Sequence, residues 1–590
     1  MSALAVMLAL SCLGCQPEAQ EAVQAAAETQ PQATASAAPP AAIRMDLSFV
    51  DRKSAAYRRF KNWVDAAAAG DEGYAFAASD AAIMYRLAPK PKYCELAVRM
   101  VDKQVADAER AIAANERPDI SGDQYLHVGP GIADLSLTLD TCGEHMDAGM
   151  RGRWSSYAEQ AVWNVWNHED AKWGGKPFPW SGWAADNPGN NYFYSFVEAT
   201  MYWALASGSQ TWMDVLRKQK LPMLREYYAK LPGGGSLEGT GYGAAHMRLF
   251  ALYRLWRDAT GEDLANASPH ATDSIAYWVN ATVPSLDRFA PIGDQSRSSV
   301  PELFDYHRRI VLEARHLTRD TGSQQIASWW LNNISVDEMQ GFNTLYDMLP
   351  TGNGGAPPRT LMHHASGTGH LFARSDWTRN AMWLAAVAGP YDESHAHQDQ
   401  GSFTLFARDW LAVTENIWTH SGIQQGTEVH NVVRFERDQT GSRQCTGDPE
   451  DKVIPQCVHA GAPSTMKVSQ GPDGAVNVDA DLTPAYGRNS AVRSWQRRLE
   501  FGARRLRVSD RFSTAPGTRA IFQVNLPERP RIEGNEATAG RLRIRVLEPA
   551  SASLSALDWR SVDEKEFPSG WRLDVAGGAD RYVVELSEEN

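Results

Sequence analysis

The chain has 590 residues and a mass of 65.1 kDa, which predicts two or more hydrophobic cores and excludes a small binding module. Hydrophobic residues make up 43% of the chain, with 20 Trp, 19 Tyr and 18 Phe, so global disorder is excluded too. With a net charge of −13 and no long basic run, the chain lacks the electrostatic affinity on which nucleic-acid binding depends. We therefore expect no nucleic-acid partner.

The chain begins with MSALAVMLALSCLG, an apolar stretch that is too short to span a bilayer and is typical of an export signal. Cys15 follows directly, in an arrangement that resembles a bacterial lipobox, in which this cysteine would carry the lipid. Residues 16–44 are small and polar, as in a disordered tether. We expect residues 1–15 to be a signal, the lipid at Cys15 to be the membrane contact, and the protein to be periplasmic or anchored to the outer membrane. A buried N-terminal helix is the alternative.

Four cysteines remain beyond the signal, and export would allow them to form disulfides. Cys445 and Cys457 are twelve residues apart in a polar loop, which makes their pairing the simpler prediction. A bond between Cys94 and Cys142 would join two helices. Four unpaired buried thiols remain the alternative.

Residues 45–355 show helical periodicity. Leu249, Leu252 and Trp256 follow one another at helical spacing, and residues 192–206 are apolar nearly all round, as in an inner helix packed on several sides. After the turn-rich residues 351–360 the period changes to two. Leu542, Ile544 and Val546 alternate with arginines, which predicts antiparallel strands over residues 356–590.

The densest group of ionisable residues lies between positions 389 and 418, near the start of the predicted β half. His395, His397 and Asp399 alternate, so an extended chain would place them on one side. Either histidine suits a base near neutral pH or a metal ligand. With Glu415 and His430, the segment also offers a His/Glu/His set of the kind zinc accepts. Solvated surface histidines are the alternative.

Two Gly-rich loops, at residues 187–196 and 231–246, run into apolar helices and would let the backbone approach a ligand closely. The second loop lacks the Lys-Ser/Thr pair of a phosphate-binding loop, so nucleotide binding is rejected. Tyr242, taken alone, is typical of a packed core aromatic. Asn190 or Asn191, taken alone, is typical of a helix cap.

The motifs together resemble the heparinase II/III-like superfamily of polysaccharide lyases, a group that includes heparin, heparan and alginate lyases. The resemblance rests on NNYFYSF, EGTGYG, PIGD (291–294), FARSDWT (372–378), SHAHQDQGSF (394–403) and VHNVV (429–433), in this order. It covers nearly all of the chain beyond the tether. It implies an incomplete (α/α) toroid followed by an antiparallel β-sheet sandwich domain, with the active cleft where the two meet.

The resemblance also implies roles for individual residues. Asn191 matches the position that neutralises the uronate carboxylate, Tyr242 the catalytic tyrosine, and His395 the histidine that faces the substrate. The matched ligands of a structural zinc are His397, Glu415 and His430, with Glu in the place of the more usual Asp. The substrate contacts we expect in the same region are Asn190, Glu238 and His246.

The expected activity is cleavage of a 4-linked uronic-acid polysaccharide, alginate or glycosaminoglycan-like, by β-elimination that leaves unsaturated ends. One alternative is an α/α-toroid glycoside hydrolase acting on uronates, for which Glu238, Asp294 and Asp399 would supply the two carboxyl groups. A second alternative is a non-catalytic surface lipoprotein that binds glycans through exposed Trp side chains. The expected partner is an acidic polysaccharide, and its identity and the oligomeric state stay open.

Overall fold

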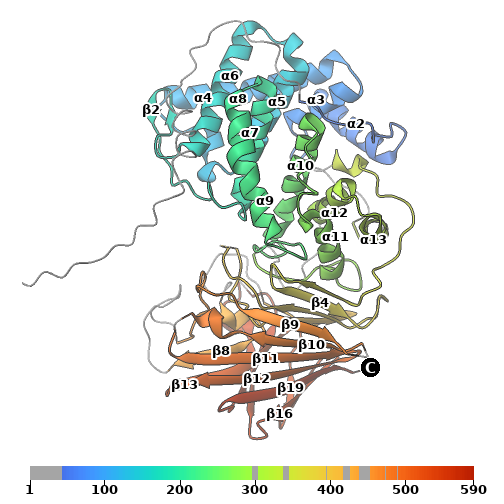
Figure 1. Ribbon diagram of the computed structural model, residues 1–590, viewed down its shortest axis with the longest axis vertical. Helices are drawn as coiled ribbons and strands as arrows, with labels where there is room; N and C mark the ends of the chain where they lie inside the picture. The colour runs from blue at the N-terminus through green and yellow to red at the C-terminus, as the bar shows by residue number, and fades with distance from the viewer. Residues whose placement is uncertain are drawn as a thin grey trace, which may run out of the picture.

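The computed structural model describes residues 43–294, 303, 305–336, 345–393, 395–415, 426–437, 452–471, 474–487, 489–565 and 567–589. A helical half lies above a half built of antiparallel sheets in Figure 1. The last described α-helix, α13 (Thr321–Leu331), and the first strand of the β half, β3 (Met362–Ala365), flank the predicted boundary at 355/356. The predicted change from helical to β structure is therefore confirmed.

The helical half contains one helix that is buried on nearly all sides, α7 (Asn191–Ser207). Its residues from Phe193 to Ala206 are buried except at Glu198 and Tyr202, which confirms the inner helix predicted from residues 192–206. The other described helices are α2 (Ala55–Ala68), α3 (Ala78–Leu87), α4 (Pro91–Ala113), α5 (Val128–Cys142), α6 (Ala148–Trp166), α8 (Gln210–Val215), α9 (Leu221–Ala229), α10 (His246–Thr260), α11 (His270–Ala281) and α12 (Asp305–Leu317).

A disulfide between Cys94 and Cys142 joins α4 to the end of α5, with 5.4 Å between the two Cα atoms. This bond confirms one of the two predicted pairings. Cys457 is disulfide-bonded as well, but Cys445 lies outside the described residues, so the second pairing stays a prediction.

The β half is built from three sheets in which every described strand pair is antiparallel. The five-stranded sheet has the order β3-β4-β5-β6-β7 and continues with β4 (His370–Arg374), β5 (Trp383–Val387), β6 (Phe403–Ala407) and β7 (Asp409–Ala412). The four-stranded sheet, β17-β18-β13-β8, contains β17 (Ser553–Asp558), β18 (Trp571–Ala576), β13 (Thr518–Leu526) and β8 (Val433–Arg437).

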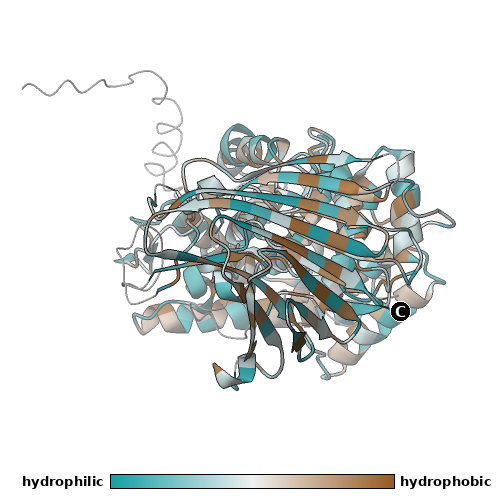
Figure 2. Cartoon of the chain, turned by 90° about the horizontal axis from the view of Figure 1, so that it is seen from below, coloured by the Kyte–Doolittle hydropathy of each residue, from teal (hydrophilic) through white to brown (hydrophobic). Residues whose placement is uncertain are grey.

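The eight-stranded sheet has the order β14-β15-β16-β19-β12-β11-β10-β9. Its strands are β14 (Arg531–Glu533), β15 (Glu536–Ala539), β16 (Leu542–Glu548), β19 (Arg581–Glu588), β12 (Arg505–Thr514), β11 (Val492–Gly502), β10 (Val476–Asp481) and β9 (Thr465–Gln470). Along β16, Leu542, Ile544 and Val546 are fully buried, as their alternation with arginines predicts. The same alternation is visible as hydrophilic and hydrophobic bands along the strands in Figure 2.

The five-stranded sheet lies against the helical half, next to α11 (Figure 1). Buried polar groups fix this contact: the Tyr277 hydroxyl lies 2.7 Å from His370 Nδ1, and the Trp383 indole donates to the Asn280 carbonyl at 3.0 Å. The Arg374 guanidinium donates to the carbonyls of Asn280 and Thr282. Because buried polar groups are costly to leave unpaired, these bonds hold the two halves in one orientation.

Among the helices of the described residues, none has both the length and the apolar character that crossing a bilayer requires.

Candidate active site

The predicted site residues of the two halves meet where backbone segments cross at the junction. The Thr240 backbone donates to the Ile292 carbonyl, and the Asp294 backbone donates to the His395 carbonyl, each at 2.8 Å. Gly239 has φ of +86°, and a Cβ there would collide with the Ile292 carbonyl oxygen, so the approach requires glycine. The loop before α10, residues 291–294 and the loop after β5 thus form one connected backbone layer.

Tyr242 and His395 lie in direct contact across this junction. Tyr242 begins the 3₁₀ turn Tyr242–Ala245, and His395 lies in the loop between β5 and β6. Their rings are stacked with 3.6 Å between centroids and an angle of 2° between planes. The His395 side chain is 17% exposed, and Tyr242 is half-buried, so both rings are accessible from the cleft. The structure brings together the two residues predicted to carry out proton transfer.

Glu238 supports the His395 ring from behind. Its Oε1 lies 2.7 Å from His395 Nδ1, and the carboxyl is 1% exposed. Burial raises the pKa of Glu238, and hydrogen bonding from His395 and from the Asn191 backbone acts against that rise. An ionised Glu238 accepts a hydrogen bond from Nδ1–H, which leaves Nε2 as the ring nitrogen that carries the lone pair. Glu238 is predicted to contact substrate, but in this position it contacts and orients His395.

The two neighbouring asparagines have separate roles. Asn190 is the N-cap of α7: its side chain accepts from the Tyr192 backbone at 3.1 Å, and the residue is 1% exposed. Asn191 Oδ1 is buried without a hydrogen-bond partner in the described structure. Asn190 is therefore the asparagine that caps the helix, and the role predicted for Asn191 stays a prediction.

His246 does not reach the surface of the site. It begins α10, is 1% exposed, and its ring contacts those of Tyr228 and His270, with centroid distances of 5.3 and 5.1 Å. Burial lowers the pKa of His246 well below its ordinary value, so the ring is neutral. A substrate in the cleft would have to displace other side chains to touch it, and we find no support for the expected contact.

The predicted zinc ligands include two histidines that lie close together. The rings of His397 and His430 are 5.2 Å apart, and both residues are buried. Asp294 accepts from His397 Nε2 at 2.8 Å, and Thr414 Oγ1, which donates to the Val429 carbonyl, accepts from His430 Nδ1 at 2.7 Å. His397 Nδ1 and His430 Nε2 then each carry a buried lone pair, and neither nitrogen has a hydrogen-bond partner in the described structure.

The third predicted ligand, Glu415, is buried next to this pair, since its backbone donates to the Val429 carbonyl at 3.0 Å. Within the described ranges, however, no set of three His, Cys, Asp or Glu side chains is arranged to hold a metal. The residues therefore fit zinc only in part. Two ring nitrogens lack a hydrogen-bond partner, and the bonds of the other two ring nitrogens fix the tautomers. The third predicted ligand lies near them but is not positioned to complete a set of three ligands.

The carboxyls proposed for a hydrolase do not form an open pair. Glu238 and Asp294 are each 1% exposed and hydrogen-bonded to histidines, and Asp399 is 5% exposed with its pKa raised to about 6, chiefly by burial. An inverting hydrolase needs one carboxyl that activates a water molecule and another that protonates the leaving oxygen. These three residues give that alternative no support.

Glu393 is a further site residue that the sequence did not predict. It lies two residues before His395 and is 5% exposed, and its oxygens accept from Asn187 at 2.9 Å and from the Tyr227 hydroxyl at 3.3 Å. Burial, together with the charge of Glu238, raises its pKa to about 7, although the bond from Asn187 opposes the rise. The only sign of Glu393 in the sequence was its place in the segment rich in acidic residues and histidines. Its hydrogen-bond partners could not be predicted, because they lie 206 and 166 residues away in the sequence.

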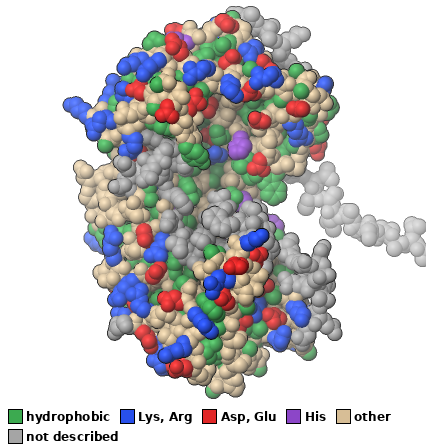
Figure 3. Space-filling model, turned by 180° about the vertical axis from the view of Figure 1, so that it is seen from behind, with side chains coloured by type: hydrophobic (Ala, Val, Ile, Leu, Met, Phe, Trp, Pro, Cys, Tyr) green, Lys and Arg blue, Asp and Glu red, His purple; other side chains and the backbone are tan. Residues whose placement is uncertain are grey.

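The surface is hollowed at the junction of the two halves, where histidine and hydrophobic side chains are visible (Figure 3). The fold is a heparinase-like polysaccharide-lyase fold. A heparinase III structure matches with a TM-score of 0.56 at 14% identity, covering 87% of this chain and 76% of that one. The heparan sulfate lyase HepC of Pedobacter heparinus matches with a TM-score of 0.52 at 15% identity, covering 93% and 86%.

A chondroitin AC lyase of Streptomyces coelicolor A3, in complex with chondroitin sulphate, matches with a TM-score of 0.50 at 11% identity, covering 92% of this chain and 80% of that one. No family model and no curated protein matches the chain. At these identities the likeness shows the fold, and the activity must be argued from the site.

We predict that Glu238→Gln lowers kcat roughly tenfold or more while leaving KM nearly unchanged, because the ring keeps its neighbour but loses the charge behind it. Because burial raises the pKa of Glu238, wild-type activity should fall in acid at a higher pH than an exposed glutamate would give. Protonation removes the negative charge behind the His395 ring, so the loss appears as pH decreases. In pH–rate profiles this acidic limb should be missing from the variant, and an identical limb in both proteins would contradict the role.

Proposed function

We propose that this protein is a polysaccharide lyase that cleaves a 4-linked uronic-acid polysaccharide by β-elimination and leaves an unsaturated uronate end. The observation that carries the proposal is the stacked Tyr242–His395 pair, supported by Glu238, at the junction of a heparinase-like fold. We also propose that the helices form an incomplete (α/α) toroid, as in the heparinase II/III-like superfamily that the sequence resembles. Support for the toroid comes from the fold likeness.

The reaction needs three functions, and this site offers one residue for each. A base removes the C5 proton, the electron pair moves toward the C6 carboxylate and then forms the C4=C5 double bond, and an acid protonates the departing O4. The amide of Asn191 offsets the charge that grows on the carboxylate, which stabilises the transition state more than the ground state. Tyr242 and His395 supply the proton transfers.

The stacking of the two rings favours elimination on one face of the sugar. Since Tyr242 and His395 lie against each other, both present their polar atoms from the same wall of the cleft. For a uronate whose C5 proton and O4 lie on one face, Tyr242 removes the proton and returns it to O4, while His395 Nε2 holds the phenolic proton during the transfer. For the opposite arrangement, with His395 as the base and Tyr242 as the acid, the two groups would have to act from opposite faces of the sugar, which this stacking does not favour.

We further propose a structural zinc held by His397 and His430, with Glu415 as the third protein ligand. The support is the pair of buried, unpartnered ring nitrogens, together with the low pKa that burial gives His430, since a ligand must be neutral. When bound, the ion would supply a crosslink that fixes the loop carrying His395. Every reaction step proposed above is carried by side chains of the chain itself.

Export is also a proposal, because the signal, Cys15 and nearly all of the tether lie outside the described residues. Its support is the Cys94–Cys142 disulfide, since such bonds persist mainly in oxidising compartments. An exported, lipid-anchored lyase would meet its polysaccharide substrate outside the cytoplasm.

We predict that Tyr242→Phe reduces turnover by roughly a thousandfold, because it removes the proton-transferring hydroxyl and keeps the ring that stacks on His395. Turnover is measured from the ultraviolet absorbance of the unsaturated product on a panel of uronate polymers. Tyr85→Phe, on α3 far from the junction (Figure 1), deletes the same group as a control. A folded Tyr242→Phe protein with near wild-type activity would disprove the mechanism.

We predict that Asn191→Ala lowers kcat more than it raises KM, since its amide acts on charge that builds up during the reaction. The matched variant Asn190→Ala should instead lower the melting temperature, because it removes the α7 cap, worth about 1 kcal/mol. Steady-state kinetics and thermal melts of both variants separate the two roles. A change confined to KM in Asn191→Ala would make this residue a ground-state contact.

We predict that purified protein without an affinity tag contains one zinc per chain and that His397→Ala and His430→Ala lower both the zinc content and the melting temperature. Zinc binding should weaken as pH falls through the histidine range, because protons compete for the bare ring nitrogens. Elemental analysis and thermal melts test this without relying on activity. Substoichiometric zinc together with wild-type melting would refute the metal site.

A further inference from the structure

A cavity of about 320 Å³ lies between the two halves, and its lining includes Asn190 and Glu393, which lie next to Asn191 and two residues before His395 in the sequence. Its volume is within the range of small-molecule sites, about 300–1,000 Å³. Both halves contribute to its wall; the polar and aromatic lining residues are Trp183, Asn187, Asn190, Asp392, Glu393 and His459. We refer to it as the junction pocket.

The junction pocket adjoins the catalytic residues through the chain on both sides. Asn190 is followed directly by Asn191, the residue assigned to the uronate carboxylate. The Glu393 carbonyl accepts from the Ala396 backbone at 3.2 Å, so Glu393 begins the turn that presents His395. A polysaccharide whose uronate lies between Asn191 and His395 would therefore place a neighbouring sugar in this pocket.

Trp183 gives the pocket an aromatic wall that is open to solvent. It is 47% exposed, which is unusual for a large hydrophobic side chain in the described structure. The turn that carries it has left-handed backbone at Gly182 (φ +70°) and at Ala184 (φ +61°), and the latter is strained for a residue with a Cβ. Ser181 accepts from the Trp183 backbone and donates to Gln124. Strain held in place around an exposed indole indicates a ring kept ready for the apolar face of a sugar.

The charged groups of the pocket are acidic. Asp392 and Glu393 both line it, and Glu393 is buried against Asn187 and Tyr227. His459 Nδ1 lies 3.3 Å from Asp392 and is thereby engaged with that carboxylate. Among the described residues that line the pocket there is no Lys or Arg. A sulfate or carboxylate placed here would face two carboxyls without a cation dedicated to it, which costs binding free energy.

We propose that the junction pocket is a sugar subsite that accepts an uncharged unit, a hexose or an N-acetylhexosamine, next to the reacting uronate. The inference rests on the proposed lyase function. It narrows the substrate to polymers in which uronate alternates with a neutral, unsulfated sugar. It disfavours sulfated glycosaminoglycans and homopolymers of uronate such as alginate, in which the neighbouring unit carries an anionic group.

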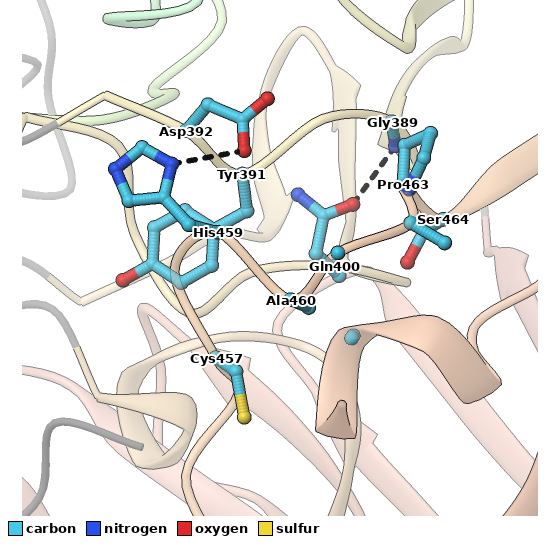
Figure 4. A pocket seen from close by; sticks show the side chains of 12 residues that line it. Gly389, Tyr391, Asp392, Gln400, Cys457, His459, Ala460, Pro463 and Ser464 are labelled. Atoms are coloured by element: carbon cyan, nitrogen blue, oxygen red, sulfur yellow. Dashed lines mark hydrogen bonds and ion pairs between the residues drawn. The ribbon is translucent and has the colours of Figure 1, made fainter. Parts of the chain in front are cut away.

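A second cavity adjoins the first on the β half. Its volume is about 390 Å³, and it shares Asp392 and His459 with the junction pocket, so this pair stands between the two spaces. Figure 4 shows Asp392 and His459 facing each other above Tyr391, with Gln400 and Ser464 on the far side. Apart from the shared pair, the labelled polar groups there are neutral.

The first test compares polymers that share a backbone and differ in sulfate. We expect kcat/KM for unsulfated chondroitin and for heparosan to exceed that for chondroitin sulfate and heparan sulfate by about tenfold or more, with polymannuronate also poor. The unsaturated product is followed by its ultraviolet absorbance. Equal or better cleavage of the sulfated forms would overturn the inference.

The second test changes the pocket. Asp392→Asn should reduce the preference for unsulfated chondroitin severalfold by improving cleavage of the sulfated form, and Trp183→Ala should raise KM roughly tenfold for both. Asp186→Asn is the matched control, because its side chain is 85% exposed, pairs with Lys220 and does not line the pocket. An Asp392→Asn protein with the wild-type preference would contradict the assignment.

A binding measurement distinguishes failure of the junction-pocket proposal from failure of the proposed lyase function. Calorimetry on the Tyr242→Phe variant, with unsulfated and sulfated chondroitin tetrasaccharides, reports the preference without turnover. Cleavage of none of the polymers overturns the lyase function, while tighter binding of the unsulfated tetrasaccharide still supports the pocket. Cleavage without that difference in binding upholds the lyase and overturns the pocket.

Discussion

The proposed catalytic site of this protein depends on the backbone contact that joins its two halves. Tyr242 belongs to the helical half and His395 to the β half, so neither half alone holds the pair. The hydrogen bond from the Asp294 backbone to the His395 carbonyl and the close passage of Gly239 past Ile292 set the distance between the rings. The proposed proton transfer would require placement within a fraction of an ångström, and this backbone layer holds the two rings in contact.

The division into a helical half and a β half could be predicted from the sequence because each kind of element has its own spacing of apolar residues. The helical spacing before residue 350 and the alternation around Leu542, Ile544 and Val546 report which faces are buried, and the structure confirms both. Tyr242 and His395 could be proposed because the motifs around them resemble those of a known superfamily. The structure places these two side chains face to face.

The local roles within the site could not be predicted in the same way. Glu238 orients His395, and Asp294 fixes His397, but each pair joins segments more than a hundred residues apart in sequence. His246 is in a polar loop context in the sequence but lies within an aromatic core in the structure. A one-dimensional pattern records burial along an element, but not which distant side chain completes a hydrogen bond.

The order of the two halves along the chain also has a consequence for when activity can arise. A ribosome has made Tyr242 and the helices around it well before it reaches His395, and the strands that hold the His395 loop come still later. A chain that ends before the β half contains Tyr242 but not His395, so it has no Tyr242–His395 pair. On the proposed mechanism, lyase activity therefore arises only after the β half has been synthesised and has folded.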